Sequence, residues 1–213
     1  MAAFLEQALD MPLREVLAKI QQRILMSSSY HGVKTLKNPL DYWVYQEIIF
    51  EEKPDVIIEI GNKWGGSALA LAHQLDLLGK GKLIAIDIDH SQIAEPVRHH
   101  PKIIFVEQAA VEAFPQVQQL INAGERVLVI EDSSHTFENT LEVLRYYSQF
   151  IARGDYLIVE DSICRHGLEV GPKPGPYEAI EAFVEENKKF VIDRAKENFF
   201  ITWNPKGFLK RVG

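Results

Sequence analysis

The sequence predicts a doubly wound α/β fold built on a parallel β-sheet, and three observations support this prediction. From Asp55 onward, short runs of β-branched residues alternate with segments of helical periodicity. A glycine-rich stretch follows the first of these runs, where open α/β sheets bind ligands. The composition, 46% hydrophobic and 25% charged, is typical of a globular domain. We therefore expect one domain over residues 1–213, with a helical N-terminal extension (1–53) and an α/β core (54–213).

The N-terminal extension is predicted to contain two helices. Apolar residues between Asp10 and Met26 fall on one helical face, and Pro12 is tolerated in the first turn of such a helix. Residues 42–51 have the same periodicity, and the polar stretch 27–41 before them is expected to be a loop. The aromatic residues of the second helix favour core packing, although they would equally suit an interface in a homo-oligomer. These residues are Tyr42, Trp43 and Tyr45.

The core is predicted to contain five parallel strands and a closing antiparallel hairpin. The strand candidates are 56–60, 83–87, 103–107, 127–131 and 156–160. Right-handed crossovers distribute the intervening helices over both faces of such a sheet. The helix candidates lie near 66–78, 91–98, 111–122 and 137–151. After a loop rich in glycine and proline come a helix over 177–188, strand candidates over 190–194 and 199–203, and a final segment, 207–212.

The charge and hydropathy of the sequence argue against a nucleic acid or a membrane as the protein's partner. The formal charge of −7 argues against a nucleic-acid partner, because phosphate binding requires clustered Lys and Arg. The sequence has no apolar run of about 20 residues that would span a bilayer, and its N-terminus is not a signal peptide. The lone Cys164 fits a reducing compartment. We expect a soluble, cytoplasmic protein that acts on a small molecule, without a membrane or nucleic-acid partner.

The turn after the first core strand is the expected cofactor site. Gly61 would let the backbone turn sharply beside a ligand, while Gly65 and Gly66 would open the next helix without Cβ crowding. The turn lacks the G-x-G-x-x-G pattern, which argues against a dinucleotide. An ordinary tight turn that binds nothing is the alternative. The cofactor contacts predicted here are Glu59, Gly61, Asn62, Gly65, Gly66 and Ser67, and Asp132 after the fourth strand is predicted to contact the cofactor as well.

Residues after the second and third strands extend this predicted site. Asp87 ends the second strand, where a carboxylate would accept hydrogen bonds from a ribose diol. Asp89 shares the same face of the strand, so the choice between the two stays open. Gln108 and Ala109 follow the third strand, at a position that would flank an adenine.

Acidic pairs follow the fourth and fifth strands. In a parallel sheet these strand ends lie side by side, and converging carboxylates raise one another's pKa values unless a cation joins them. Oxygen ligands suit Mg²⁺, with Mn²⁺ a close second. Asp132, Glu160 and Asp161 are the predicted ligands. Solvated strand ends or helix caps are the alternative.

His135 lies three residues after Asp132 and is expected to face the same cleft. Its neutral imidazole would take a proton from a substrate hydroxyl, so His135 and Asp132 are the predicted catalytic residues. A surface or capping histidine is the alternative. The segments 30–37 and 164–176 flank this edge of the sheet and are candidates for a substrate lid.

The chain resembles the cephalosporin hydroxylase-like family, which includes rhamnosyl O-methyltransferases, and more distantly it resembles catechol O-methyltransferase. The motifs that carry this resemblance are Lys37-Asn38-Pro39, Tyr45-Gln46-Glu47, Glu59-Ile60-Gly61, Gly65-Gly66-Ser67, Asp132-Ser133, His135, Val159-Glu160-Asp161, Gly175-Pro176, Asn204-Pro205 and 207–211. The resemblance implies a Rossmann-like class I methyltransferase fold with sheet order 3-2-1-4-5-7-6 and an antiparallel last strand. It also implies S-adenosylmethionine as cofactor and a Mg²⁺ ion at Asp132, Glu160 and Asp161.

Three positions depart from the relatives. The catechol enzyme has a lysine base where this chain has His135, Asn62 stands where the family often has threonine, and residues 108–110 lack the usual glycine and serine. The predicted function is a Mg²⁺-dependent O-methyltransferase that acts on a hydroxyl of a sugar or natural product. One alternative, a hydroxylase or the partner of an oxygenase, would need a redox centre, whereas the cleft offers at most one histidine. The other alternative binds S-adenosylmethionine without catalysis.

Overall fold

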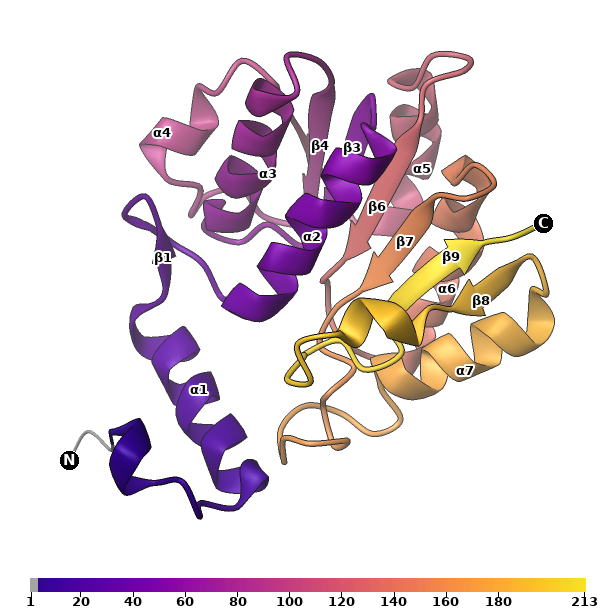
Figure 1. Cartoon of the computed structure of the whole chain (residues 1–213). Coiled ribbons are helices and arrows are strands. Elements are labelled where there is room, and N and C mark those ends of the chain that lie inside the picture. The colour runs from indigo at the N-terminus through magenta and orange to yellow at the C-terminus, as the bar shows by residue number, and fades with distance from the viewer. Residues whose placement is uncertain (1–3) are drawn as a thin grey trace.

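A seven-stranded β-sheet with helices on both faces forms the centre of the computed structural model, which describes residues 4–213 (Figure 1). The strand order is β5-β4-β3-β6-β7-β9-β8. Strand β9 is antiparallel to both of its neighbours, and the other pairs are parallel. Counted from β3 as the first core strand, this order is 3-2-1-4-5-7-6. The predicted fold class is therefore confirmed.

The central strands are buried on both faces, as parallel strands covered by helices must be. The register pairs Ile60 of β3 with Glu131 of β6, and Glu131 with Val159 of β7. The three strands therefore end level, and the residues that follow them become neighbours. The strands are β3 (Val56–Ile60), β4 (Lys82–Asp87), β5 (Ile103–Glu107), β6 (Val127–Glu131), β7 (Tyr156–Val159), β8 (Phe190–Ile192) and β9 (Phe208–Arg211).

Side-chain alternation divides the apolar core into two layers. Ile58 and Ile60 pack with one group of helices, whereas Ile57 packs with the other group across the sheet. The first group is α5 (Ala110–Gln119), α6 (Phe137–Tyr147) and α7 (Pro176–Glu186). The second group is α2 (Pro39–Glu52), α3 (Gly66–Leu77) and the short α4 (Glu95–Arg98). A 3₁₀ turn, η2 (Ser148–Phe150), extends α6.

The N-terminal extension contains the two predicted helices and a small hairpin that was not predicted. After η1 (Leu5–Gln7) and α1 (Leu13–Ser27), strands β1 (Ser29–Tyr30) and β2 (Val33–Lys34) pair before α2. Leu17 and Ile24 of α1 pack on Trp203, and the Trp203 indole N–H donates to Gln21 Oε1 at 2.6 Å. Within α2, Tyr45 is buried but Trp43 is 57% exposed, so core packing explains only one of these two aromatics.

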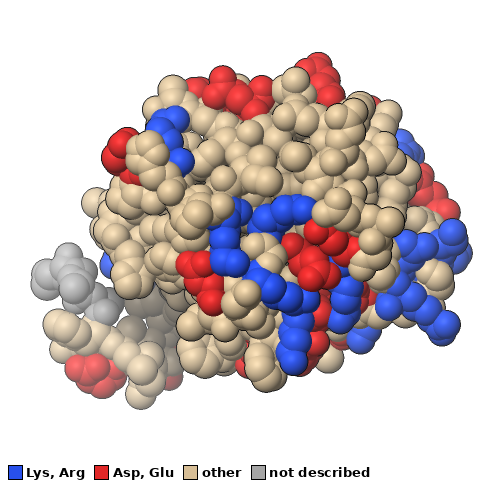
Figure 2. All heavy atoms as spheres, turned by 90° about the horizontal axis from the view of Figure 1, so that it is seen from above, with Lys and Arg blue, Asp and Glu red and all other residues tan. Residues whose placement is uncertain are grey.

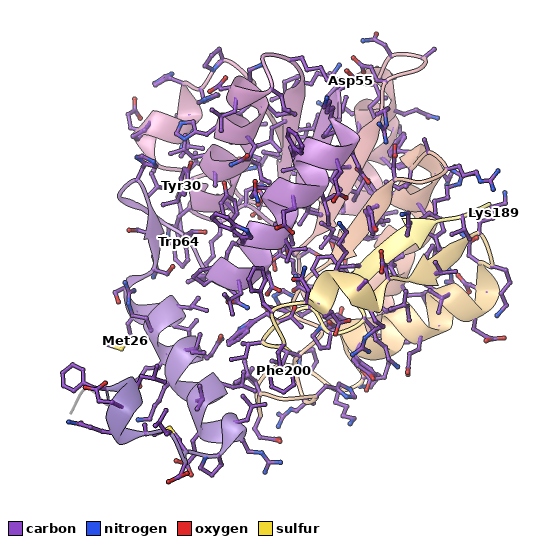
Figure 3. The ribbon with its side chains drawn as sticks, in the orientation of Figure 1. Met26, Tyr30, Asp55, Trp64, Lys189 and Phe200 are labelled. Carbon is purple, nitrogen blue, oxygen red and sulfur yellow. The ribbon has the colours of Figure 1, made fainter. Side chains whose placement is uncertain are left out.

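The predicted strand over residues 199–203 is wrong. Phe200 has a φ of 67° and is exposed, and no strand is assigned to this segment (Figure 3). Its apolar residues alternate because Ile201 and Trp203 face α1, and not because they pair in a sheet. The closing hairpin is formed by β8 and β9, and η3 (Arg194–Glu197) lies in the connection between them.

The end of the sheet where the parallel strands begin carries mixed charge. Seen from above, Lys and Arg side chains are interspersed there with Asp and Glu (Figure 2). Lys80 pairs with Asp55 at 2.7 Å and Lys82 pairs with Glu125 at 3.0 Å. None of the helices within residues 4–213 has the length and apolar character needed to cross a membrane.

A buried carboxyl at the end of α2 makes stability depend on pH. Neither oxygen of Glu52 has a hydrogen-bond partner, and burial and the nearby Asp155 raise the pKa of Glu52 from 4.5 to about 8. Below pH 4.5 the group is protonated in both the folded and unfolded chain. Between pH 4.5 and 8 only the unfolded chain ionises, so the folded state loses stability as pH rises.

We therefore expect Glu52→Gln to match the parent protein at pH 5 and to exceed its stability at pH 9. The rise of the Glu52 pKa from 4.5 to about 8 corresponds to about 5 kcal/mol at most, so we expect a gain of at least about 2 kcal/mol, or at least about 4 °C in Tm. Thermal melts at both pH values measure it. The exposed Glu185→Gln provides the control and should shift Tm equally little at either pH. A gain of the same size at pH 5 and pH 9 would contradict the assigned pKa.

Candidate active site

A cavity of about 480 Å³ opens at the carboxyl ends of strands β3, β4 and β6. Most of the predicted site residues line its wall. They are Gly61, Asn62, Gly66, Ser67, Asp87, Gln108, Ala109, Asp132, His135 and Asp161. Three other predicted residues, Glu59, Gly65 and Glu160, are not among the residues that line the wall. This volume lies in the range of small-molecule and cofactor sites.

Asp87 closes the turn between β3 and α3. Its Oδ2 accepts the backbone N–H groups of Asn62 and Lys63, each at 2.8 Å. Its Oδ1 accepts only the N–H of Asp89, at 3.4 Å. Both Asp87 and Asp89 line the cavity. Asp89 Oδ1 accepts the backbone N–H of Ser91 at 2.8 Å. Asp87 is half-buried and fixed against the turn, whereas Asp89 is exposed, so this placement favours Asp87 as the acceptor for a ligand.

Glu59 supports the turn from beneath the cavity wall. Its side chain belongs to the face of β3 that α2 and α3 cover, and it is fully buried. Oε2 accepts the Nδ2 group of Asn62 at 2.7 Å, whereas Oε1 has no hydrogen-bond partner and lies 3.8 Å from Lys37 Nζ. Burial raises the pKa of Glu59, and Lys37 opposes that rise. Glu59 does not line the cavity, and its predicted contact with a cofactor stays a prediction.

Lys37 occupies the centre of the acidic cluster, and the sequence analysis noted it only as part of a motif. Its ammonium donates to Asp132 Oδ2 at 2.5 Å and to Glu160 Oε1 at 2.7 Å. Burial lowers the pKa of Lys37, but the surrounding carboxylates outweigh burial and raise it overall, so the group stays charged. Glu160, which was predicted to be a metal ligand, therefore already has a cationic partner.

The segment that carries Lys37 is fixed at both ends. On one side, a Cβ atom on Gly66 would lie 2.4 Å from the Lys34 carbonyl oxygen, so only glycine permits this close approach. On the other side, Asn38 caps α2 by accepting the N–H of Leu40 at 3.2 Å, with Pro39 in the first helical position. The position of Lys37 is thus fixed by a close approach to α3 on one side and by the start of α2 on the other.

His135 and Asp161 come from different loops and lie side by side in the cavity wall. His135 Nε2 lies 3.5 Å from Asp161 Oδ2 and 3.9 Å from Asp132 Oδ1. Both residues have left-handed backbones, with φ of 57° for His135 and 55° for Asp161, and such conformations cluster at functional sites. The side chains predicted to act together are therefore in one place.

Two residues that the sequence analysis did not assign to the site hold Asp161 in position. The Asp161 N–H donates to Asn204 Oδ1 at 3.2 Å, and Asn204 Nδ2 donates to the Tyr45 hydroxyl at 2.6 Å. The Asn204-Pro205 and Tyr45-Gln46 motifs were the available sequence signal. This chain of hydrogen bonds ties the end of β7 to α2.

The cluster holds more negative charge than Lys37 balances. Burial and Asp132 raise the pKa of Asp161 to about 6, and His135 opposes the rise. Burial and Asp132 also raise the pKa of Glu160, which Lys37 opposes. One ligand atom from each of Asp132, His135 and Asp161 lies within 4.8 Å of the others. These three donors fit a divalent cation.

The two predicted lid segments lie differently with respect to the cavity. Residues 34–37 form part of its wall, whereas residues 164–176 do not. Lys34 Nζ lies 4.0 Å above the Trp64 ring, so the β1–β2 hairpin contacts the turn after β3 (Figure 3). The N-terminal extension therefore forms one wall of the cavity, through residues 34–37.

Comparison with known proteins identifies the family of this chain. The model of the family described as rhamnosyl O-methyltransferase/CmcI matches residues 22–212. The chain belongs to this family. The membership confirms the predicted family and the predicted enzyme class, a methyltransferase.

Curated relatives agree with this assignment, and solved structures share the fold. The rhamnosyl O-methyltransferase of Mycobacterium tuberculosis is 36% identical over 191 residues, which cover 86% of this chain and 78% of the relative. That of Mycobacterium leprae is 36% identical over 193 residues, covering 87% and 83%. An apo structure of CmcI has a TM-score of 0.69 at 23% identity, covering 87% of this chain and 76% of CmcI. CmcI with Mg-SAM has a TM-score of 0.68 at 22% identity, covering 90% and 84%. At this identity the structures show the shared fold.

Proposed function

We propose that this chain transfers the methyl group of S-adenosylmethionine to a hydroxyl of a small molecule, with a sugar hydroxyl as the favoured acceptor and a divalent cation at the acidic cluster. One observation carries the proposal: a single cavity has the Asp87 carboxylate in its wall together with Asp132, His135 and Asp161. Relatives named rhamnosyl O-methyltransferase support the sugar acceptor. A CmcI structure with Mg-SAM supports the choice of cofactor and ion.

The cofactor would lie along the carboxyl ends of the strands. Asp87 Oδ1 would accept the hydrogen bonds of the ribose diol, because its other oxygen already holds the turn. Gln108 and Ala109 line the same cavity and would flank the adenine. Gly61 and Asn62 would contact the methionine part. S-adenosylmethionine supplies the reactive methyl group when it is bound.

The remaining site residues would position and deprotonate the acceptor. Methyl transfer from a sulfonium to an oxygen is an in-line displacement, so holding the hydroxyl at the correct distance and angle accounts for much of the rate. Asp132 and Asp161 would hold Mg²⁺ or Mn²⁺, and such an ion lowers the pKa of a hydroxyl that binds to it. The predicted role of His135, uptake of the hydroxyl proton at Nε2, remains a prediction. Lys37 keeps Asp132 in place from the opposite side.

Calorimetry with S-adenosylmethionine, with and without Mg²⁺, and a methyl-transfer screen over hydroxylated sugars and natural products test this proposal. We expect cofactor binding by the parent protein and transfer to at least one acceptor. An Asp161→Ala variant should keep cofactor affinity within about threefold, yet lose metal-dependent turnover by at least about a hundredfold.

Glu185→Ala, which alters an exposed carboxylate of an i,i+3 pair with Lys188, is the control and should behave as the parent protein does. Unchanged turnover in Asp161→Ala would remove the ion from the mechanism. Cofactor binding without transfer to any acceptor would favour the non-catalytic alternative. Oxidation of an acceptor in place of methylation would favour the hydroxylase alternative.

A further inference from the structure

A cluster of imidazoles lies beside α3, outside the cavity of the candidate active site. Three of the seven histidines gather there: His31 at the turn of the β1–β2 hairpin, His73 on α3, and His100 between α4 and β5. Asp76 follows His73 by three residues, which puts both on one face of α3. The hairpin contacts this helix (Figure 1), so the cluster joins three segments of the fold.

The polar atoms of His73, Asp76 and His100 converge on one point. One ligand atom from each lies within 4.8 Å of the others. His100 Nε2 lies 3.1 Å from Asp76 Oδ2. Two ligand atoms of a tetrahedral ion lie about 3.3 Å apart at bond lengths of about 2.0 Å. An ion therefore fits between these atoms with a small movement of the side chains.

The ring of His73 is oriented from its other side. The Tyr30 hydroxyl lies 3.1 Å from His73 Nδ1 (Figure 3). A hydroxyl both donates and accepts, so this bond persists when Nδ1 carries the proton and Nε2 binds an ion. Metal-binding histidines are usually oriented by such a bond. Burial and the neighbouring His100 lower the pKa of His73, which favours the neutral ring that binds metals.

His100 exchanges one long hydrogen bond for the ion. Its Nδ1 accepts the backbone N–H of Lys102 at 3.3 Å, so Nε2 carries the proton that faces Asp76. Coordination through Nε2 moves this proton to Nδ1 and gives up the bond from Lys102. The side chain of His100 is only 11% exposed, so its ring stays close to Asp76 in both forms.

His31 completes a set of four ligands. Its ring centroid lies 5.7 Å from that of His73, and the His100 centroid lies 5.6 Å from the same ring. Imidazoles bound to one tetrahedral ion have centroids about 5 Å apart, because each centroid lies about 3 Å from the ion. His31 is exposed at the tip of the hairpin, so rotation of its side chain brings a ring nitrogen to the ion.

We propose that a Zn²⁺ ion clasps the β1–β2 hairpin to α3, held by His31, His73, Asp76 and His100. Three imidazoles and one carboxylate suit Zn²⁺ better than Mg²⁺, which prefers oxygen ligands. Because residues 34–37 continue from the hairpin and form one wall of the cavity, the ion fixes that wall. The site is separate from the acidic cluster and does not depend on the proposed function.

Counting bound Zn²⁺ by equilibrium dialysis tests the site. The acidic cluster can also take up Zn²⁺, so the decisive quantity is the difference between the parent protein and a variant at low micromolar free Zn²⁺. His100→Ala should bind one ion fewer than the parent protein. His99→Ala, which alters an exposed neighbour paired with Glu95, is the matched control and should bind as many as the parent. Equal numbers of ions in the parent and His100→Ala, or a difference seen only at millimolar Zn²⁺, would overturn the proposal.

Two further variants separate the ligands from their surroundings. Asp76→Asn alters an exposed side chain of α3, so it takes the place of His100→Ala if circular dichroism shows that His100→Ala does not fold. It should bind Zn²⁺ at this site at least about thirtyfold more weakly than the parent protein, whereas Tyr30→Phe keeps every ligand and should weaken binding by about tenfold. Unchanged affinity in Asp76→Asn would contradict the ligand set.

Hydrogen exchange followed by mass spectrometry tests the clasp. Zn²⁺ should slow amide exchange in residues 29–34 of the parent protein by at least about tenfold, and it should not do so in His100→Ala. Exchange in α7, which packs on the other face of the sheet, is the internal control and should stay unchanged. Unaltered exchange in the hairpin with the ion bound would rule out a clasp. These measurements need neither cofactor nor acceptor, so they stand whether or not methyl transfer is found.

Discussion

Replacement of Asp132 with asparagine is expected to lower the rate of methyl transfer by at least about a thousandfold, which corresponds to about 4 kcal/mol in the activation free energy. Asp132 is the shared element of the acidic cluster, since one oxygen accepts from Lys37 at 2.5 Å and the other lies 3.9 Å from His135. Asparagine keeps the shape of the side chain but loses its charge. The ion then loses a ligand, and Lys37 loses one of its two close partners.

Single-turnover kinetics with saturating S-adenosylmethionine and Mn²⁺ measure this effect. We expect the folded state of Asp132→Asn to survive, because Glu160 still accepts from Lys37 at 2.7 Å and one of several mutually repelling buried carboxylates has become neutral. A Tm within a few degrees of the parent protein would separate lost chemistry from lost structure. Glu185→Gln, at an exposed carboxylate of α7, is the matched control and should keep the parent rate. A loss of less than tenfold in Asp132→Asn would place the chemistry elsewhere.

The sheet was predictable because its signals are local. Each of the five parallel strands is a short β-branched run bounded by turns, and these runs match β3 to β7 within one residue at either end. The tail was harder to predict. The alternation over 199–203 reflects contact with α1, a helix far away in the sequence, and no local pattern distinguishes such contact from strand pairing. The β1–β2 hairpin has two residues in each strand, too few for any periodicity.

The candidate site was predictable where it depends on strand ends, and not where it depends on distant segments. Asp132, His135 and Asp161 line one cavity because β6 and β7 end level, which the parallel sheet already required. The position of Lys37 depends on how the extension folds back over the sheet, about a hundred residues away in sequence from the carboxylates that it binds. Glu160 has the charge and spacing of a ligand, but spacing cannot show that another side chain already occupies its oxygen.

Gly61→Ala is expected to destabilise the folded protein by at least about 3 kcal/mol, lowering Tm by about 6–12 °C. A Cβ atom on Gly61 would lie 2.0 Å from the carbonyl oxygen of Asp132, which is backbone and has no rotamer to escape into. The ends of β3 and β6 are held at this spacing by a hydrogen bond, since the Asp132 N–H donates to the Ile60 carbonyl at 2.8 Å. On the other side of β3, the Gly61 N–H donates to the Ile86 carbonyl of β4, also at 2.8 Å. The φ of 90° at Gly61 adds the cost of a left-handed alanine.

Gly124→Ala separates the two contributions. Gly124 has a similar φ of 86°, but a Cβ atom there would meet no atom within 4 Å, so its substitution should cost only about 1–2 kcal/mol. The excess loss in Gly61→Ala, measured by thermal melts of both variants, is then the cost of separating β3 from β6. Because that separation moves the backbone of Asp132, the affinity for Mn²⁺ should fall in Gly61→Ala and stay unchanged in Gly124→Ala. Equal losses of stability in the two variants would mean that the close approach of the strands is not what requires glycine at position 61, and that the site tolerates a wider spacing than its geometry implies.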